Sequence, residues 1–157
     1  PSFSLIVPVK DEEDVAARIL DRLMEADYPS DRYEVIVVDD ASSDDTPKIC
    51  KRFERLYADR IRYLSRDASF GKPSALNYGL KYAEGDIVGV LDADNVPEKD
   101  FLWRTARYFA DKNVVGVQGL LSSINAEENL LTKFLHYEGV LHFDALFSGR
   151  EKLGLFV

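Results

Sequence analysis

The chain has 157 residues, of which 46% are hydrophobic and 31% charged, so it is long enough for one domain with a substantial core. Its 28 acidic residues outnumber its 20 basic residues and give a formal net charge of −8, which excludes the broad basic surface that nucleic-acid binding requires. No apolar run approaches the ~18 residues of a membrane-spanning helix, so the chain itself is predicted to be soluble.

Short apolar, β-branched runs alternate with segments of helical periodicity along most of the chain. In chain order, strands are predicted over residues 3–9, 33–38, 61–64, 87–91 and 114–117. The helices between them are predicted over residues 12–26, from 47 onward after Thr46 as N-cap, over 73–83 and over 98–111. Cys50, the only cysteine, falls on the apolar side of the second helix and is expected in the core.

This alternation predicts an α/β fold, because parallel strands need crossovers and right-handed crossovers place helices on both faces of the sheet. Residues 1–119 are expected to form the core of one domain spanning 1–157. After them, Asn125 and Glu128 form a capping box for a long helix that is apolar over a wide arc. We expect residues 130–157 to expose an apolar patch that favours self-association.

Acidic residues follow three of the predicted strands. Asp11 and Glu12 come after the first strand, Asp39 and Asp40 end the second, and Asp92-Ala93-Asp94 follows the fourth. Because ligands of open parallel sheets bind beyond the carboxyl ends of the strands, these residues are candidates for a common site.

Asp92 and Asp94 both reach one divalent cation if the chain turns after the strand, as Asn95 and Pro97 suggest. Without a cation, two carboxylates about 5 Å apart repel by roughly 3 kcal/mol at an effective dielectric of about 20, and Mg²⁺ or Mn²⁺ removes that cost. A lone Asp-x-Asp is more often a solvated turn, but three acidic strand ends at one edge favour the metal site.

Two further groups of polar residues each allow two interpretations, and the two histidines allow one. Asp39 and Asp40 form either a helix-capping device or a ligand site, where a buried carboxylate would accept the N3–H of uracil. Arg66, Gly71 and Lys72 lie either in a solvated loop or beside a diphosphate. His136 and His142 are six residues apart, which is a poor spacing for a metal pair on one helix.

Five short motifs occur in a characteristic order: Ile6-Val7-Pro8-Val9-Lys10-Asp11-Glu12, Val37-Val38-Asp39-Asp40-Ala41-Ser42, Gly71-Lys72, Ala75-Leu76-Asn77 and Leu91-Asp92-Ala93-Asp94. Over nearly its whole length the chain resembles family 2 glycosyltransferases, and most closely the processive cellulose, chitin and poly-N-acetylglucosamine synthases. The resemblance implies a Rossmann-like GT-A fold, a UDP-sugar donor, a Mg²⁺ or Mn²⁺ cofactor and inverting transfer to an acceptor hydroxyl.

Residue roles follow from the resemblance by position. Asp40 would hold the uracil, Asp92 would meet the ribose and the metal, and Asp94 would ligate the metal directly. The full set implied for the nucleotide sugar is Pro8, Val9, Lys10, Glu12, Asp39, Asp40, Arg66, Gly71, Lys72, Asp92 and Ala93.

Two departures limit the resemblance. Lys10 and Asp11 stand where the family usually has an aromatic residue followed by Asn, so base stacking at this position is not implied. The family's Glu-Asp pair, which supplies the catalytic base, and its Gln-x-x-Arg-Trp motif are expected beyond Val157. The chain is therefore expected to be the donor-binding part of a longer enzyme at the cytoplasmic face of a membrane, acting on a saccharide or lipid-linked acceptor, and to be nearly inactive alone.

Three other functions fit parts of the pattern. The chain could be a non-catalytic nucleotide-sugar-binding module, which an assay of sugar transfer by the full-length protein distinguishes. A sugar-phosphate nucleotidyltransferase would carry a Gly-rich, Arg-containing loop in place of Val9-Lys10-Asp11-Glu12. A phospho-receiver domain has its acidic pair after the first strand, whereas here the pair Asp39-Asp40 follows the second.

Overall fold

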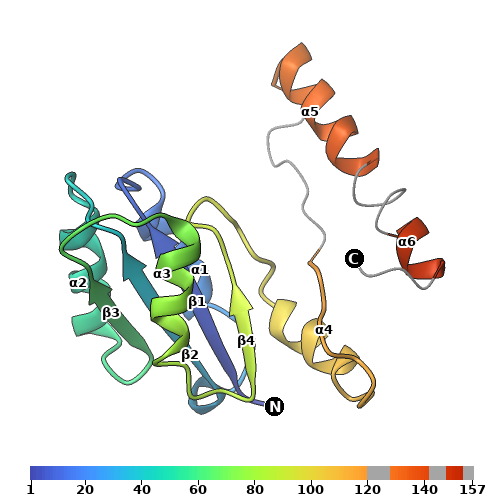
Figure 1. Cartoon of the computed structure of the whole chain (residues 1–157), viewed down its shortest axis with the longest axis horizontal. Coiled ribbons are helices and arrows are strands. Elements are labelled where there is room, and N and C mark those ends of the chain that lie inside the picture. The colour runs from blue at the N-terminus through green and yellow to red at the C-terminus, as the bar shows by residue number, and fades with distance from the viewer. Residues whose placement is uncertain (120–127, 142–147, 154–157) are drawn as a thin grey trace. The chain divides into compact units, whose positions relative to one another are not determined.

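The computed structural model describes residues 1–119, 128–141 and 148–153. The chain forms two units, Pro1–Val114 and Val115–Val157. The first unit holds a four-stranded sheet made of β1 (Phe3–Val9), β2 (Tyr33–Asp39), β3 (Ile61–Ser65) and β4 (Ile87–Val90). The strand order is β3-β2-β1-β4 and every pair is parallel, which confirms the predicted α/β class (Figure 1).

Helices cover both faces of this sheet, as predicted. The helices of the first unit are α1 (Ala16–Met24), α2 (Thr46–Leu56), α3 (Lys72–Leu80) and α4 (Phe101–Tyr108), with a short 3₁₀ helix, η1 (Ser30–Arg32), before β2. Side chains alternate along each strand, so Leu5 and Val7 of β1 pack with α1 and α2 on one face, while Ile6 packs with α3 on the other.

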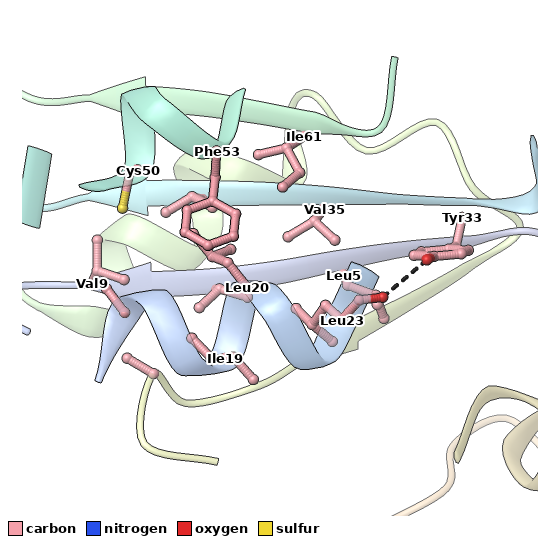
Figure 2. Packing of buried hydrophobic residues seen from close by; sticks show 14 of the residues in the cluster. Leu5, Val9, Ile19, Leu20, Leu23, Tyr33, Val35, Cys50, Phe53 and Ile61 are labelled. Carbon is pink, nitrogen blue, oxygen red and sulfur yellow. Dashed lines mark hydrogen bonds between the residues drawn. The ribbon is translucent and has the colours of Figure 1, made fainter. Parts of the chain in front are cut away.

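The larger core lies between the sheet and the pair α1 and α2. Figure 2 shows Leu20 of α1 beside the Phe53 ring of α2, and Leu23 of α1 beside Leu5 of β1 and Tyr33 of β2. Cys50 is fully buried in this cluster, as expected, and burial raises its pKa to about 12. The Tyr33 hydroxyl donates a 2.9 Å hydrogen bond to the Leu23 carbonyl, so the phenol is satisfied within the core.

Helix α3 approaches the opposite face of the sheet closely because Gly79 has no side chain. A methyl group at this position would lie 2.9 Å from side-chain carbons of both Ile6 and Val38. Ala75, one turn earlier, is fully buried against the same face. These two small residues therefore let α3 pack closely against this face of the sheet.

The predicted fifth strand does not form. Residues 114–117 are not a strand, and Val115 is 91% exposed, because within the described chain their backbone finds no strand to pair with. As a result β4 has β1 as its one described partner, and its side chains Val88 and Val90 are exposed. A β-branched run records a preference for extended structure, but a strand forms only where a neighbour completes its hydrogen bonds.

The second unit contains α5 (Leu130–Val140) and α6 (Ser148–Lys152). Asn129, not the predicted pair, caps α5: its side chain accepts the Thr132 N–H and the Thr132 hydroxyl accepts the Asn129 N–H, each at 3.0 Å. Asn125 and residues 142–147 of the predicted long helix lie outside the described residues. Leu130, Phe134 and Leu141 are exposed, as expected for this apolar helix.

Candidate nucleotide-sugar and metal site

The carboxyl ends of β1, β2 and β4 meet the amino end of α3 at one pocket of about 350 Å³. In the strand order, β1 has β2 on one side and β4 on the other, so the pocket lies where the chain reverses its direction across the sheet, which is where open α/β sheets bind ligands. Its lining residues are Pro8, Val9, Lys10, Glu12, Asp40, Gly71, Lys72, Ala75, Asp92, Ala93 and Asp94.

The structure brings together every predicted site residue except Asp39 and Arg66, which do not line the pocket. Ala75 lines it although the sequence did not suggest this. The sequence could have indicated this, because Ala75 follows Lys72 by three residues and therefore lies on the same face of the helix.

Asp39 is buried and has structural partners. It is 1% exposed, and its carboxylate accepts hydrogen bonds from the Tyr63 hydroxyl at 2.5 Å and from the Ser42 N–H at 2.9 Å. Burial of Tyr63, together with this bond to a carboxylate, raises the pKa of the phenol. Asp39 therefore fixes the loop after β2 and ties it to β3.

Asp40 borders the pocket but points its carboxylate at the loop between β3 and α3. It accepts hydrogen bonds from the Ser69 hydroxyl at 2.6 Å and from the N–H groups of Gly71 at 2.8 Å and Phe70 at 3.2 Å. An ion pair with Arg66 at 2.9 Å completes the set. Burial opposes ionisation, but these donors outweigh it and lower the pKa of Asp40.

Hydrogen bonds join the loop after β1 to the loop after β2, beside the pocket. The Ser43 N–H donates to the Asp11 carboxylate at 2.7 Å, and the Glu12 N–H donates to the Thr46 hydroxyl at 2.8 Å. Thr46 is thus not the N-cap that the sequence predicted: Asp45 occupies that position, and Thr46 is the buried first residue of α2. Asp11 has a left-handed φ of 53°, which these contacts hold in place.

Asn95 shapes the turn that carries Asp92 and Asp94. Its side-chain oxygen accepts the Asp92 N–H at 3.1 Å, its backbone N–H donates to the Asp92 carbonyl at 3.0 Å, and its amide donates to the Asp94 carboxylate at 3.4 Å. Arg18 of α1 donates to the Asp94 carbonyl at 3.2 Å. The Lys72 ammonium pairs with the Asp92 carboxylate from the start of α3.

Negative charge accumulates at this end of the pocket. Burial, followed by the charges of Asp94, Asp44 and Asp92, raises the pKa of Glu12. A divalent cation would relieve this repulsion. Among the described residues no group of three His, Cys, Asp or Glu side chains is arranged to hold a metal. Two carboxylates suffice for Mg²⁺ or Mn²⁺ when phosphate oxygens and water complete the shell, so the residues present fit such an ion.

A family model for glycosyl transferase family 2 matches residues 4–156, which is nearly the whole chain. The chain belongs to this family. A β-monoglucosyldiacylglycerol synthase from Synechocystis sp. is 42% identical over 136 residues, which cover 85% of this chain and 28% of the relative. The probable glycosyltransferase YdaM of Bacillus subtilis is 38% identical over 144 residues, covering 89% of this chain and 34% of the relative.

Solved structures of glycosyltransferases share the fold. The mannosyltransferase PcManGT of Pyrobaculum calidifontis, in complex with GDP-Man and Mn²⁺, has a TM-score of 0.69 and 37% identity over 73% of this chain and 34% of its own. The fragment 1–349 of TarS from Staphylococcus aureus, in complex with UDP-GlcNAc, has a TM-score of 0.65 and 28% identity over 78% of this chain and 38% of the fragment. These neighbours confirm a GT-A-like fold.

The chain spans about a third of the length of these family 2 relatives. They include glucosyldiacylglycerol synthases and TarS, and so do not specifically support the expected likeness to cellulose and chitin synthases. None of the described helices is both long and apolar enough to span a bilayer.

Proposed function

We propose that the pocket binds the UDP-sugar donor of an inverting, metal-dependent glycosyltransferase, with Asp92 and Asp94 holding Mg²⁺ or Mn²⁺. The observation that carries this proposal is the meeting of an acidic turn with the amino end of α3 at the switch point of the sheet. Two structural neighbours support it, since PcManGT is in complex with GDP-Man and Mn²⁺ and TarS with UDP-GlcNAc.

The diphosphate is assigned to the side of the pocket formed by α3. Gly71, with a φ of 82°, turns the chain into the helix, and Lys72 is its first residue. The helix amino end and the ammonium group both favour anionic oxygen. When bound, the metal would act as a Lewis acid that stabilises charge developing on the leaving nucleoside diphosphate.

Lys72 has two tasks in this proposal. In the structure its ammonium neutralises Asp92, and both side chains are about half exposed. Because such a solvated pair contributes little stability, it separates readily when a cation arrives at the carboxylates. Lys72 is then available to a phosphate oxygen on the α3 side of the pocket.

The catalytic base and the acceptor site are assigned to other parts of the full-length protein. An inverting displacement needs a base to remove the acceptor proton, and the family resemblance assigns that role to none of the pocket residues. The names of the relatives, a β-monoglucosyldiacylglycerol synthase and a poly(ribitol-phosphate) β-N-acetylglucosaminyltransferase, favour a lipid or poly(ribitol-phosphate) acceptor. Action at the cytoplasmic face of a membrane is a finer proposal, which rests on the sequence resemblance alone.

Titration calorimetry with UDP tests the donor and metal assignments together. We expect UDP to bind in the presence of Mn²⁺ and to bind at least tenfold more weakly with excess chelator. Equal affinity under the two conditions would refute the metal role. Tighter binding of GDP than of UDP would refute the choice of uracil. Sugar transfer by the full-length protein distinguishes an enzyme from a binding module.

A further inference from the structure

One residue, Asn95, closes the turn after β4 with two hydrogen bonds to Asp92. Its backbone N–H donates to the Asp92 carbonyl at 3.0 Å, and its side-chain oxygen accepts the Asp92 N–H at 3.1 Å. The first bond is that of an ordinary β-turn, which any residue except proline can make. The second bond needs a side chain with an accepting oxygen. Asn95 therefore constrains this turn more tightly than its backbone alone would.

The same side chain also reaches the second acidic residue of the turn. The Asn95 amide nitrogen donates to the Asp94 carboxylate at 3.4 Å. An amide side chain carries both an acceptor and two N–H donors, so it serves a backbone N–H and a carboxylate at once. Because it is neutral, it does so without adding charge to a place where Asp92 and Asp94 already raise the pKa of Glu12.

The middle of the turn is fixed by burial. Ala93 is 3% exposed and packs in the core cluster between the sheet and α1, whereas Asp92 and Asp94 are exposed and line the pocket. Arg18 of α1 adds a bond of 3.2 Å to the Asp94 carbonyl. The core and Arg18 thus hold the backbone of the turn, and among these contacts only those of the Asn95 side chain touch both Asp92 and an acidic head group.

We infer that Asn95 is the positioning residue of the proposed metal site, where it holds Asp92 and Asp94 so that both carboxylates serve one divalent cation. The inference rests on the proposed function of the pocket. A carboxylate that ligates a metal is oriented by the groups that hydrogen-bond to it and to its backbone, and loss of such a group typically weakens metal binding about 10–100-fold. Asn95 itself is not assigned as a ligand.

Calorimetric titrations with UDP at a series of Mn²⁺ concentrations test the inference. The quantity compared is the Mn²⁺ concentration that gives half of the full increase in UDP affinity. It should rise about tenfold in Asn95→Ala, which keeps the backbone bond of the turn and loses both side-chain bonds. In Asn95→Ser, whose hydroxyl accepts a nearby backbone N–H more weakly than an amide does, it should rise by no more than about threefold.

The melting temperature in metal-free buffer separates positioning from folding. Both Asn95 variants should keep it within about 4 °C of wild type, because the bonds that they lose are exposed. Asn113→Ala is the matched control. The Asn113 N–H and amide donate to the Asp111 carboxylate at 2.9 and 3.0 Å in another turn, and Asn113 does not line the pocket. This variant should need the same Mn²⁺ concentration as wild type.

Three results would overturn the positioning role and leave the proposed function standing: an unchanged Mn²⁺ requirement in Asn95→Ala, no recovery in Asn95→Ser, or a large fall in the metal-free melting temperature of Asn95→Ala. UDP binding by the wild-type chain that does not depend on Mn²⁺ would overturn the metal role in the proposed function, and this inference with it.

Discussion

Replacing Asp40 by Asn removes one charge at the centre of the loop that borders the pocket. Asp40 is 3% exposed, and its carboxylate accepts hydrogen bonds from Ser69, Phe70 and Gly71 and forms an ion pair with Arg66. An amide keeps one accepting oxygen and turns an NH₂ group toward at least one of these donors. The variant therefore loses the ion pair and one or more charge-assisted hydrogen bonds.

The expected loss is about 2 kcal/mol of unfolding free energy. Breaking a fully buried ion pair costs about 3–5 kcal/mol, and each charge-assisted hydrogen bond contributes about 1.5–3 kcal/mol. We take the low end because the Arg66 side chain is 14% exposed and so keeps some contact with water when its partner is removed. For a chain of this length, 2 kcal/mol lowers Tm by about 4–8 °C. Asp100→Asn, which affects an exposed pair with Arg104, should change stability by less than about 0.5 kcal/mol.

The effect should depend on pH in one direction. The pKa of Asp40 in the folded chain lies below its ordinary value of 3.8, so its contribution is fully present above pH 3.8 and is lost as the pH falls through the lower folded value. Thermal melts from pH 7 to pH 3 should show a constant gap between wild type and Asp40→Asn above about pH 5, and a closing gap below 3.8. An equal Tm at pH 7, or a gap that widens in acid, would refute this role for Asp40.

Three further outcomes are expected. Asp94→Asn should abolish the Mn²⁺ dependence of UDP affinity in calorimetry without lowering Tm in metal-free buffer, because it removes carboxylate repulsion; a large metal-free loss would make Asp94 structural. Gly85→Ala should lower the unfolding free energy by about 2 kcal/mol, roughly the cost of overpacking, because the added methyl would lie 2.6 Å from the Phe3 and Ser4 backbone. Gly116→Ala, where no described atom lies within 4 Å of the added methyl, should leave the unfolding free energy unchanged in a denaturant titration. Cys50, buried and with a pKa of about 12, should resist iodoacetamide at pH 8 until the chain unfolds, as mass spectrometry would show.

Four strands and the helices between them were predictable because their apolar spacing reflects burial. The residues at which the helices begin and end were harder to predict. Residues 12–26 have helical spacing, yet α1 begins at Ala16. The acidic residues before it bond instead to the loop after β2: Glu13 N–H donates to the Asp44 carboxylate at 3.0 Å, and the Glu13 carboxylate accepts the Asp45 N–H at 2.9 Å. Such partners lie about thirty residues away in sequence, beyond the reach of local propensity.

Asp39 and Asp40 show what the sequence lacked at the site itself. Side chains alternate along β2, so Asp39 points toward the face covered by α1 and α2 and Asp40 toward the face covered by α3. This alternation places the two carboxylates on opposite faces of the sheet, but it does not show which of them reaches the pocket. That depends on strand order. Right-handed crossovers that step from β1 to β2 to β3 in one direction place α1 and α2 on one face, and the return to β4 places α3 on the other. Since the loop that enters α3 carries Gly71 and Lys72, the carboxylate on that face, Asp40, is the one that reaches the site.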